Sequence, residues 1–151
     1  MNTFHDKYQA FLSDFGNGRT LVLSISENDI VSSRMMSVIQ IEGVFYFQTD
    51  VTFKKYRQLL SNPNVALCIY NIQIEGVCEE LGHPLQNTSF CECFKKCFKG
   101  SYDAYTSLKN ERLFSVKPSF IERWIYDSGI PNIETFDVNT QTYKIHKYTG
   151  I

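Results

Sequence analysis

Apolar and polar residues alternate along much of this chain, which is the spacing of half-buried β-strands. The pattern predicts about seven short strands bounded by turn residues, among them residues 34–41, 44–49, 65–70, 72–80 and 142–148. The run at 65–70 is continuously apolar, so a strand buried on both faces is expected there. Residues 120–126 fit either a strand or a helical turn, and their aromatic and β-branched content favours a strand.

Helical spacing replaces this alternation at several places. Apolar residues recur every three to four positions in residues 3–15, and the glycines that follow end that helix. A second helix is expected over residues 53–61. Two shorter ones are expected over 90–98 and 101–108, separated by Gly100.

Residues 34–63 join three of these elements. Glu42-Gly43 separates two strand-like runs, as in a β-hairpin, because glycine accepts a positive φ. In the helix that follows, Thr52 is the predicted cap and Asn62-Pro63 ends the helix. The apolar face of that helix is expected to consist of Phe53, Tyr56, Leu59 and Leu60.

Together these elements predict a mainly β fold, a β-barrel with flanking helices, with a sandwich as the alternative built from short strands. The helices are too few, and the connections between strands too short, for a doubly wound parallel sheet. The 151 residues suit one domain with a sizeable core, and residues 1–151 contain no repeat or linker that divides them.

Composition narrows the classes of function. Apolar residues make up 43% of the chain and aromatic residues 15%, which excludes a disordered protein. The net charge of −1 argues against a nucleic-acid partner, and no apolar run is long enough to span a membrane. The N-terminus lacks a signal-peptide pattern and the five cysteines are an odd number, so we expect free thiols and a cytoplasmic location.

Polar side chains gather around the hairpin and the start of the following helix. They come from the first strand, the end of the second and the first helical turn: Arg34, Ser37, Gln48, Thr49, Lys54 and Lys55. Cations at a helix N-terminus oppose the macrodipole at a cost of about 0.3–1 kcal/mol each, and a bound anion reverses that sign. Free N–H groups, ammonium groups, a guanidinium and hydroxyls could then converge on a phosphate. The alternative is a solvated basic helix beside a hairpin.

The cysteines and histidines are weaker candidates. Cys91, Cys93 and Cys97 lack the paired spacing of a zinc site and have no histidine among them, so half-buried thiols are expected there instead of metal ligands. The histidines are isolated, no nucleophile elbow is present, and neither glycine-rich nucleotide motif occurs. A nucleotide cofactor would therefore need a different scaffold.

The stretch around the hairpin resembles the FMN-binding split-barrel family, the pyridoxamine 5′-phosphate oxidase-like group. The resemblance rests on residues 34–39, the glycine hairpin, residues 45–49, Lys54-Lys55 and Asn62-Pro63, and it covers residues 19–80. It implies a Greek-key split β-barrel that forms a homodimer, with FMN at the subunit interface.

The resemblance also implies roles for individual residues. Arg34 and the two lysines would hold the phosphate of FMN, and the backbone from Met35 to Val38 would meet the edge of the isoalloxazine ring. Gln48 and Thr49 would contact the cofactor, and Asn71 would hydrogen-bond the ring. The implied cofactor-binding set is Arg34, Met35, Met36, Ser37, Val38, Gln48, Thr49, Lys54, Lys55 and Asn71. It includes no metal ligand and identifies no catalytic residue.

Some positions depart from the oxidase proper. Ile39 stands where that enzyme has a lysine, and Lys-Ile-His at residues 144–146 replaces its substrate-binding Arg-x-His. Residues 81–110 contain no counterpart of its substrate-binding helix. These departures point to the small single-barrel relatives, which include nitroimidazole-reductase-like proteins.

The sequence therefore predicts an FMN-dependent oxidoreductase that passes electrons from a reduced nicotinamide to a small-molecule acceptor. One alternative is a non-catalytic carrier or sensor of flavin or haem, in which His83 or His146 would be the haem ligand. A third possibility is an empty barrel that acts only through its dimer surface.

Overall fold

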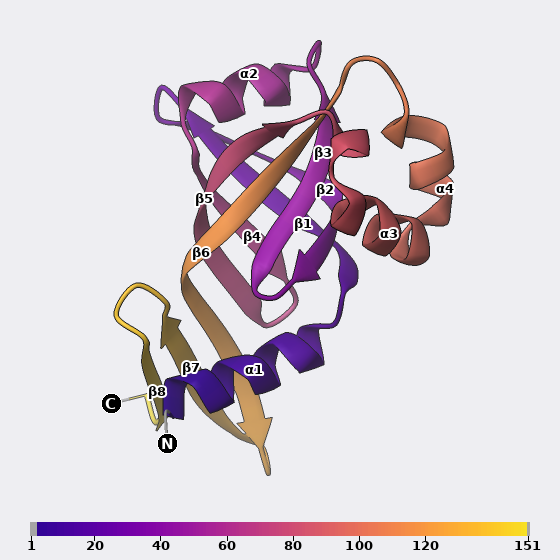
Figure 1. Cartoon of the computed structure of the whole chain (residues 1–151). Helices are drawn as coiled ribbons and strands as arrows, with labels where there is room; N and C mark the ends of the chain where they lie inside the picture. The colour runs from indigo at the N-terminus through magenta and orange to yellow at the C-terminus, as the bar shows by residue number, and fades with distance from the viewer. Residues whose placement is uncertain (1–2, 151) are drawn as a thin grey trace.

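The structure is a computed structural model that describes residues 3–150, and it combines an antiparallel sheet with short helices around it (Figure 1). The strands are β1 (Gly18–Glu27), β2 (Ile30–Ile41), β3 (Val44–Asp50), β4 (Asn64–Ile69), β5 (Ile72–Gly82), β6 (Glu111–Asp127), β7 (Ile130–Asp137) and β8 (Thr142–Lys147). The helical segments are α1 (Thr3–Phe15), α2 (Lys54–Ser61), η1 (Pro84–Gln86), α3 (Thr88–Cys97), α4 (Lys99–Ser101) and η2 (Tyr102–Thr106).

Strands β1 to β6 close into a barrel. The sheet order is β3-β2-β1-β4-β5-β6, and β3 also pairs with β6, from Phe45 opposite Val116 to Asp50 opposite Glu111. The connection from β3 to β4 carries α2 over one end of the barrel, so β4 pairs with β1 and not with β3 (Figure 1). This is Greek-key order, and the predicted mainly β split barrel with flanking helices is confirmed.

β6 pairs with the barrel strand β5 as far as Arg123 and then extends beyond the barrel. It pairs with β7, which pairs with β8, so a three-stranded extension projects below the barrel in Figure 1. Helix α1 packs on this extension, where the rings of Phe4, Tyr8 and Phe11 surround Phe136.

One strand replaces the two segments that the sequence suggested around Pro118. Residues 114–116 and 120–126 both belong to β6, which is 17 residues long. Pro118 lies opposite Gly76, next to a register shift in β5. A proline is tolerated at such an irregularity because no ladder hydrogen bond from its nitrogen is required.

The core fills the barrel with alternate residues of each strand. In β1, Leu21, Leu23 and Ile25 are buried, whereas the residues between them lie on the outer face. The expectation that residues 65–70 are buried on both faces is wrong. β4 alternates too, and Cys68 is exposed, because a barrel wall has only one face toward the core.

Helix α2 departs from its expected cap and face. It begins at Lys54, and the residue before it, Phe53, makes no side-chain capping bond. Thr52 is not the cap, since its hydroxyl donates to Asp50 Oδ1 at 2.7 Å. Phe53 and Leu60 are each 55% exposed, so the buried face of the helix is narrower than the sequence indicated. The helix ends before Asn62, as expected.

Residues 84–108, here called the cover, pack as a set of short helices beside the barrel (Figure 1). Phe90 and Phe94 stack with ring centroids 4.9 Å apart and contact Ile39 and Leu113 in a small second core. The helix expected at 101–108 is instead a short α-helical turn followed by the π-helical turn Tyr102–Thr106. Within residues 3–150 no helix is long and apolar enough to cross a membrane.

Candidate functional site

A cleft of about 380 Å³ opens between the barrel and the cover. Its strand wall is formed by β2, the end of β3, the start of α2 and the first residue of β6: Met35, Met36, Ser37, Gln48, Thr49, Asp50, Phe53, Lys55 and Glu111. Its other wall belongs to the cover: Phe94, Ser101, Tyr105 and Leu108. The cleft therefore combines a polar side with an apolar and aromatic side, as small-molecule sites do.

Two cations lie close together at the strand wall without a strong anionic partner. Lys55 Nζ is 3.0 Å from Met36 Sδ. Burial, and next the charge of Arg34, lower the pKa of Lys55 to about 8, although Glu111 acts in the opposite direction. Burial also lowers the pKa of Arg34. Both shifts mean that no anion within the protein fully offsets the cost of burying these two positive charges.

Two hydrogen-bond donors in this region are buried and unused. Arg34 Nη2 donates to Ser32 Oγ at 3.1 Å, but Arg34 Nη1 has no partner, and neither has Thr49 Oγ1. Among the described residues the same is true of one further side-chain atom, Gln58 Oε1. A buried polar atom without a partner costs about 1–3 kcal/mol. Such a pair of atoms is expected where a ligand supplies acceptors.

Two acidic groups, Asp50 and Glu111, also line the cleft. Glu111 is 5% exposed, and burial, followed by the charge of Asp50, raises the pKa of its carboxyl. Lys55 and His83 oppose that shift. Asp50 accepts bonds from the backbone and hydroxyl of Thr52, which lower its pKa. Sequence analysis did not identify Glu111, because it and its cleft neighbours Tyr105 and Leu108 lie far along the chain from the hairpin residues.

The structure brings six of the residues suggested by the sequence to the cleft: Met35, Met36, Ser37, Gln48, Thr49 and Lys55. Arg34 does not line the cleft but interacts with Lys55. The side chain of Val38 is buried in the barrel core, which leaves only its backbone for a ligand.

Two of the suggested residues lie elsewhere. Lys54 is exposed and does not line the cleft. Asn71 lies at the turn between β4 and β5, where its amide donates to the carbonyl of Trp124 at 2.6 Å, in a separate shallow hollow. Whether these residues contact a cofactor stays a prediction.

The histidines and cysteines offer little to a metal or a haem. His83 uses both ring nitrogens, one with the carbonyl of Leu108 and one with the backbone N–H of Leu85. His146 is exposed on β8. Cys91, Cys93 and Cys97 are half-buried, as expected, and pack around the small second core. Over residues 3–150 there is no group of three or more His, Cys, Asp or Glu residues placed to hold a metal ion.

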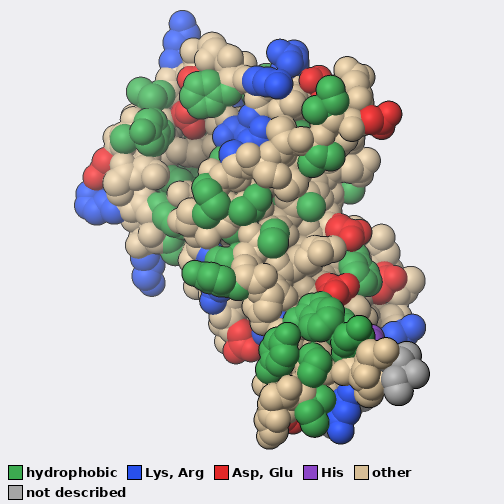
Figure 2. All heavy atoms as spheres, turned by 180° about the vertical axis from the view of Figure 1, so that it is seen from behind, with side chains coloured by type: hydrophobic (Ala, Val, Ile, Leu, Met, Phe, Trp, Pro, Cys, Tyr) green, Lys and Arg blue, Asp and Glu red, His purple; other side chains and the backbone are tan. Residues whose placement is uncertain are grey.

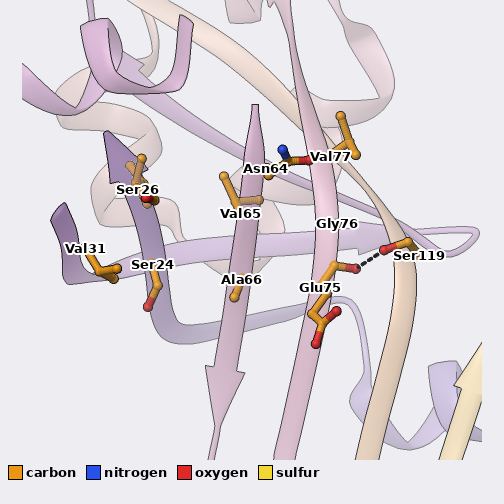
Figure 3. Close-up of a pocket in the computed structure, with 11 residues that line it drawn as sticks. Ser24, Ser26, Val31, Asn64, Val65, Ala66, Glu75, Gly76, Val77 and Ser119 are labelled. Carbon is orange, nitrogen blue, oxygen red and sulfur yellow. Dashed lines mark hydrogen bonds between the residues drawn. The ribbon is translucent and has the colours of Figure 1, made fainter. Parts of the chain in front are cut away.

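A second hollow, of about 400 Å³, lies on the outer face of β1, β4 and β5. Figure 3 shows Ser24 and Ser26 of β1 in this hollow, near Ala66 of β4 and Glu75 of β5. Its lining contains no lysine, arginine or histidine and no buried atom without a partner. The cleft beside the cover is therefore the better candidate site, because it contains a lysine and a buried donor without a partner.

The sequence matches no family model and no curated protein. Solved structures do resemble the fold. A pyridoxamine 5′-phosphate oxidase-related, FMN-binding protein from Nostoc punctiforme is 12% identical, with a TM-score of 0.63 over 87% of each chain. General stress protein 26 from Bacillus anthracis is 24% identical, with a TM-score of 0.57 over 80% of this chain and 92% of that one. A NimC/NimA family protein from Clostridium acetobutylicum is 14% identical, with a TM-score of 0.54 over 85% of this chain and 84% of that one.

These matches show that the chain has the split-barrel fold of pyridoxamine 5′-phosphate oxidase-like proteins. The family resemblance inferred from residues 19–80 is confirmed at the level of the fold. The same fold is found in a reductase of F420 and in PhzG from Burkholderia lata. Because the identities are low, the cofactor and the reaction must be argued from the cleft itself.

Proposed function

We propose that this chain binds FMN in the cleft between the barrel and the cover, and that it is a flavin-dependent oxidoreductase. The observation that carries the proposal is the pair of buried, unused donors, Arg34 Nη1 and Thr49 Oγ1, beside the under-compensated ammonium of Lys55. A phosphate monoester offers several strong acceptors and about two negative charges. It would satisfy both donors and balance both cations.

The cleft also suits the rest of a flavin nucleotide. Apolar and aromatic side chains form the wall opposite the donors, which suits a large planar ring. Bound FMN would accept electrons from a reduced nicotinamide and pass them to a small acceptor. The residues of the chain would hold the phosphate, orient the ring and limit the access of water.

We further propose that two copies associate through the outer face of β1, β2 and β4. The exposed and half-exposed side chains there are small or apolar and carry no charge: Val22, Ser24, Ser26, Val31, Ser33, Met35, Ala66 and Cys68. Met35 lines the cleft, and it also lines a shallow hollow with Val22, Cys68 and Tyr70. A second copy on this face would therefore cover the open edge of the cleft.

A second apolar area lies beyond the barrel. Figure 2 shows hydrophobic side chains gathered over the lower end of the molecule, where the strands of the extension lie. Tyr126, Ile130 and Tyr148 are exposed there, and the ring of Trp124 packs edge-on against Tyr148. Acidic side chains lie between this patch and the barrel in Figure 2, so it is a second apolar area, and patches of this kind on soluble proteins commonly mark interfaces.

The dimer is tested by sedimentation of the wild type and of Ser24→Arg. We expect a dimer for the wild type and a monomer for the variant, because a charge in the middle of an uncharged face is costly to bury. Ser61→Arg, at the exposed end of α2, is the matched control and should remain a dimer. A monomeric wild type at concentrations well above those of the binding assay would contradict the proposal.

FMN binding is tested by titrating the purified protein and following the quenching of flavin fluorescence. We expect saturation at micromolar FMN. Loaded protein should then oxidise NADH or NADPH when a quinone or a nitroaromatic compound is supplied as acceptor. Binding without turnover would favour the second candidate, a flavin carrier or sensor. A haem carrier is not favoured, because both ring nitrogens of His83 are already used and His146 is exposed on β8 and does not line the cleft.

A further inference from the structure

We infer that Thr106 positions the side-chain amide of Gln48 so that the NH2 group of Gln48 faces the cleft. Gln48 lies near the end of β3, and Thr106 lies in the cover, 58 residues further along the chain. The hydroxyl of Thr106 donates to Gln48 Oε1 at 3.0 Å. The contact between Thr106 and Gln48 does not depend on any ligand, whereas its consequence for FMN rests on the proposed function.

A carboxamide has one accepting end and one donating end. Thr106 occupies the accepting oxygen of Gln48, so the donating nitrogen is the end left for a ligand. Thr106 itself is fully buried, while Gln48 is half-buried and lines the cleft. The cover therefore shields the bond between them from water, and a hydrogen bond shielded from water is stronger than an exposed one.

The local backbone supports a specific role for this contact. A buried threonine in a helix commonly bonds to a carbonyl of the preceding turn. Thr106 instead reaches a side chain of the strand wall. It is also the last residue of the π-helical turn Tyr102–Thr106. Such turns are rare in proteins, and those that occur are often found at functional sites. The same turn presents Tyr105 to the cleft.

The strand wall then carries donors from three residues. Gln48 and Thr49 are neighbours in β3, so their side chains leave opposite faces of the strand, but both line the cleft, and so does Lys55. These three donors favour ligand atoms that accept hydrogen bonds, such as carbonyl and phosphoryl oxygens. Thr106 is a positioning residue, because it acts on the ligand only through Gln48.

The first arm of the test uses no ligand. In a ¹H–¹⁵N spectrum the side-chain NH2 signals of Gln48 are identified by their loss in Gln48→Ala. We expect these signals to be as ordered as the backbone in the wild type and in Thr106→Ser, and mobile in Thr106→Val. A mobile Gln48 amide in the wild type, or an ordered one in Thr106→Val, would overturn the inference. The wild-type measurement decides even if Thr106→Val does not fold.

The second arm measures the dissociation constant of FMN. Loss of one neutral hydrogen bond predicts a weakening of about tenfold in Thr106→Val, with Thr106→Ser within about twofold of the wild type. In a chain that already carries Gln48→Ala, Thr106→Val should raise the dissociation constant of FMN by less than about twofold, because the side chain that Thr106 positions is already absent. Thr135→Val on β7, away from the cleft, is the matched control and should change nothing.

An equal loss from Thr106→Val with and without Gln48 would show a merely structural effect and would contradict the inference. If the wild type binds no FMN at all, the proposed function fails. The first arm still decides whether Thr106 fixes Gln48.

Discussion

The two walls of the cleft differ in chemistry and in how they are held. The strand wall carries Lys55 and the unused hydroxyl of Thr49, with Arg34 acting on Lys55 from beside it, and it belongs to the main barrel, where ladder hydrogen bonds and a large core fix it. The cover contributes Phe94, Tyr105 and Leu108, and a small separate core attaches it to the barrel. The comparison indicates that one wall recognises charge while the other encloses the ligand.

The cover is also the wall that should separate first. Phe90 and Phe94 of the cover and Ile39 and Leu113 of the barrel strands form a cluster distinct from the barrel core. Regions held by few buried contacts open at lower free energy than the global transition. Changes in the cover and in the strand wall should therefore have separable effects.

The largest effect is expected from Phe94→Ala. Phe94 is 1% exposed and stacks on Phe90, so its truncation should lower the free energy of unfolding of the cover by about 3–4 kcal/mol. In urea, helical circular dichroism should then be lost before the fluorescence of Trp124, the single tryptophan, changes. Phe53→Ala is the control, because Phe53 also lines the cleft but is 55% exposed. Coincident, unshifted transitions in Phe94→Ala would contradict the idea of a separate cover.

The next effect is expected at the two adjacent lysines. Lys55→Ala should weaken FMN by about 1.5–3 kcal/mol, roughly ten- to a hundredfold, because a charge-assisted bond is lost. Lys54→Ala should change the dissociation constant less than about twofold, since Lys54 is exposed and does not line the cleft. Fluorescence titration of both variants measures this. Equal losses would mean that the cleft is not where the phosphate binds.

The third prediction concerns pH. Raising the pH above 8 should stabilise the protein without FMN but weaken its binding of FMN. The pKa of Lys55 is lowered from 10.5 to about 8. Without FMN the unfolded chain holds this proton more tightly than the folded one. Stability should therefore rise as the pH increases from 8 toward 10.5.

With FMN the bound phosphate favours charged Lys55, so affinity should fall as the pH passes above 8. Denaturation and titration series from pH 7 to 9, with Lys55→Ala as the reference, measure both slopes. The variant should lose both of these contributions. If it retains the fall in affinity, another group is responsible.

The smallest effect is expected from Thr52→Ala. A helix cap is worth about 1 kcal/mol, but Thr52 bonds to Asp50 and does not cap α2. We therefore expect a change of less than about 0.5 kcal/mol in the free energy of unfolding, which is typical of an exposed position. A loss of 1 kcal/mol or more would restore the cap that the sequence suggested.

The strand wall could be predicted from the sequence because its parts are neighbours in the chain. The hairpin at Glu42-Gly43 places β2, which carries Arg34, next in the chain to β3, which carries Gln48, and Lys55 follows β3 within a few residues. Alternation also identified the strands, apart from the continuity of β6 past Pro118, which depends on the distant Gly76. Short helices were expected in the cover, but its place at the site could not be predicted, since Thr106, like Glu111 of β6, reaches the site only through the closure of β6 on β3.

The most direct test of the account compares FMN with riboflavin, which lacks the phosphate, in one fluorescence titration of the wild type. Two cations and two unused donors should make FMN bind at least about thirtyfold more tightly than riboflavin. Equal affinity for the two flavins would show that Arg34, Thr49 and Lys55 do not hold a phosphate, and the account of the cleft would be wrong.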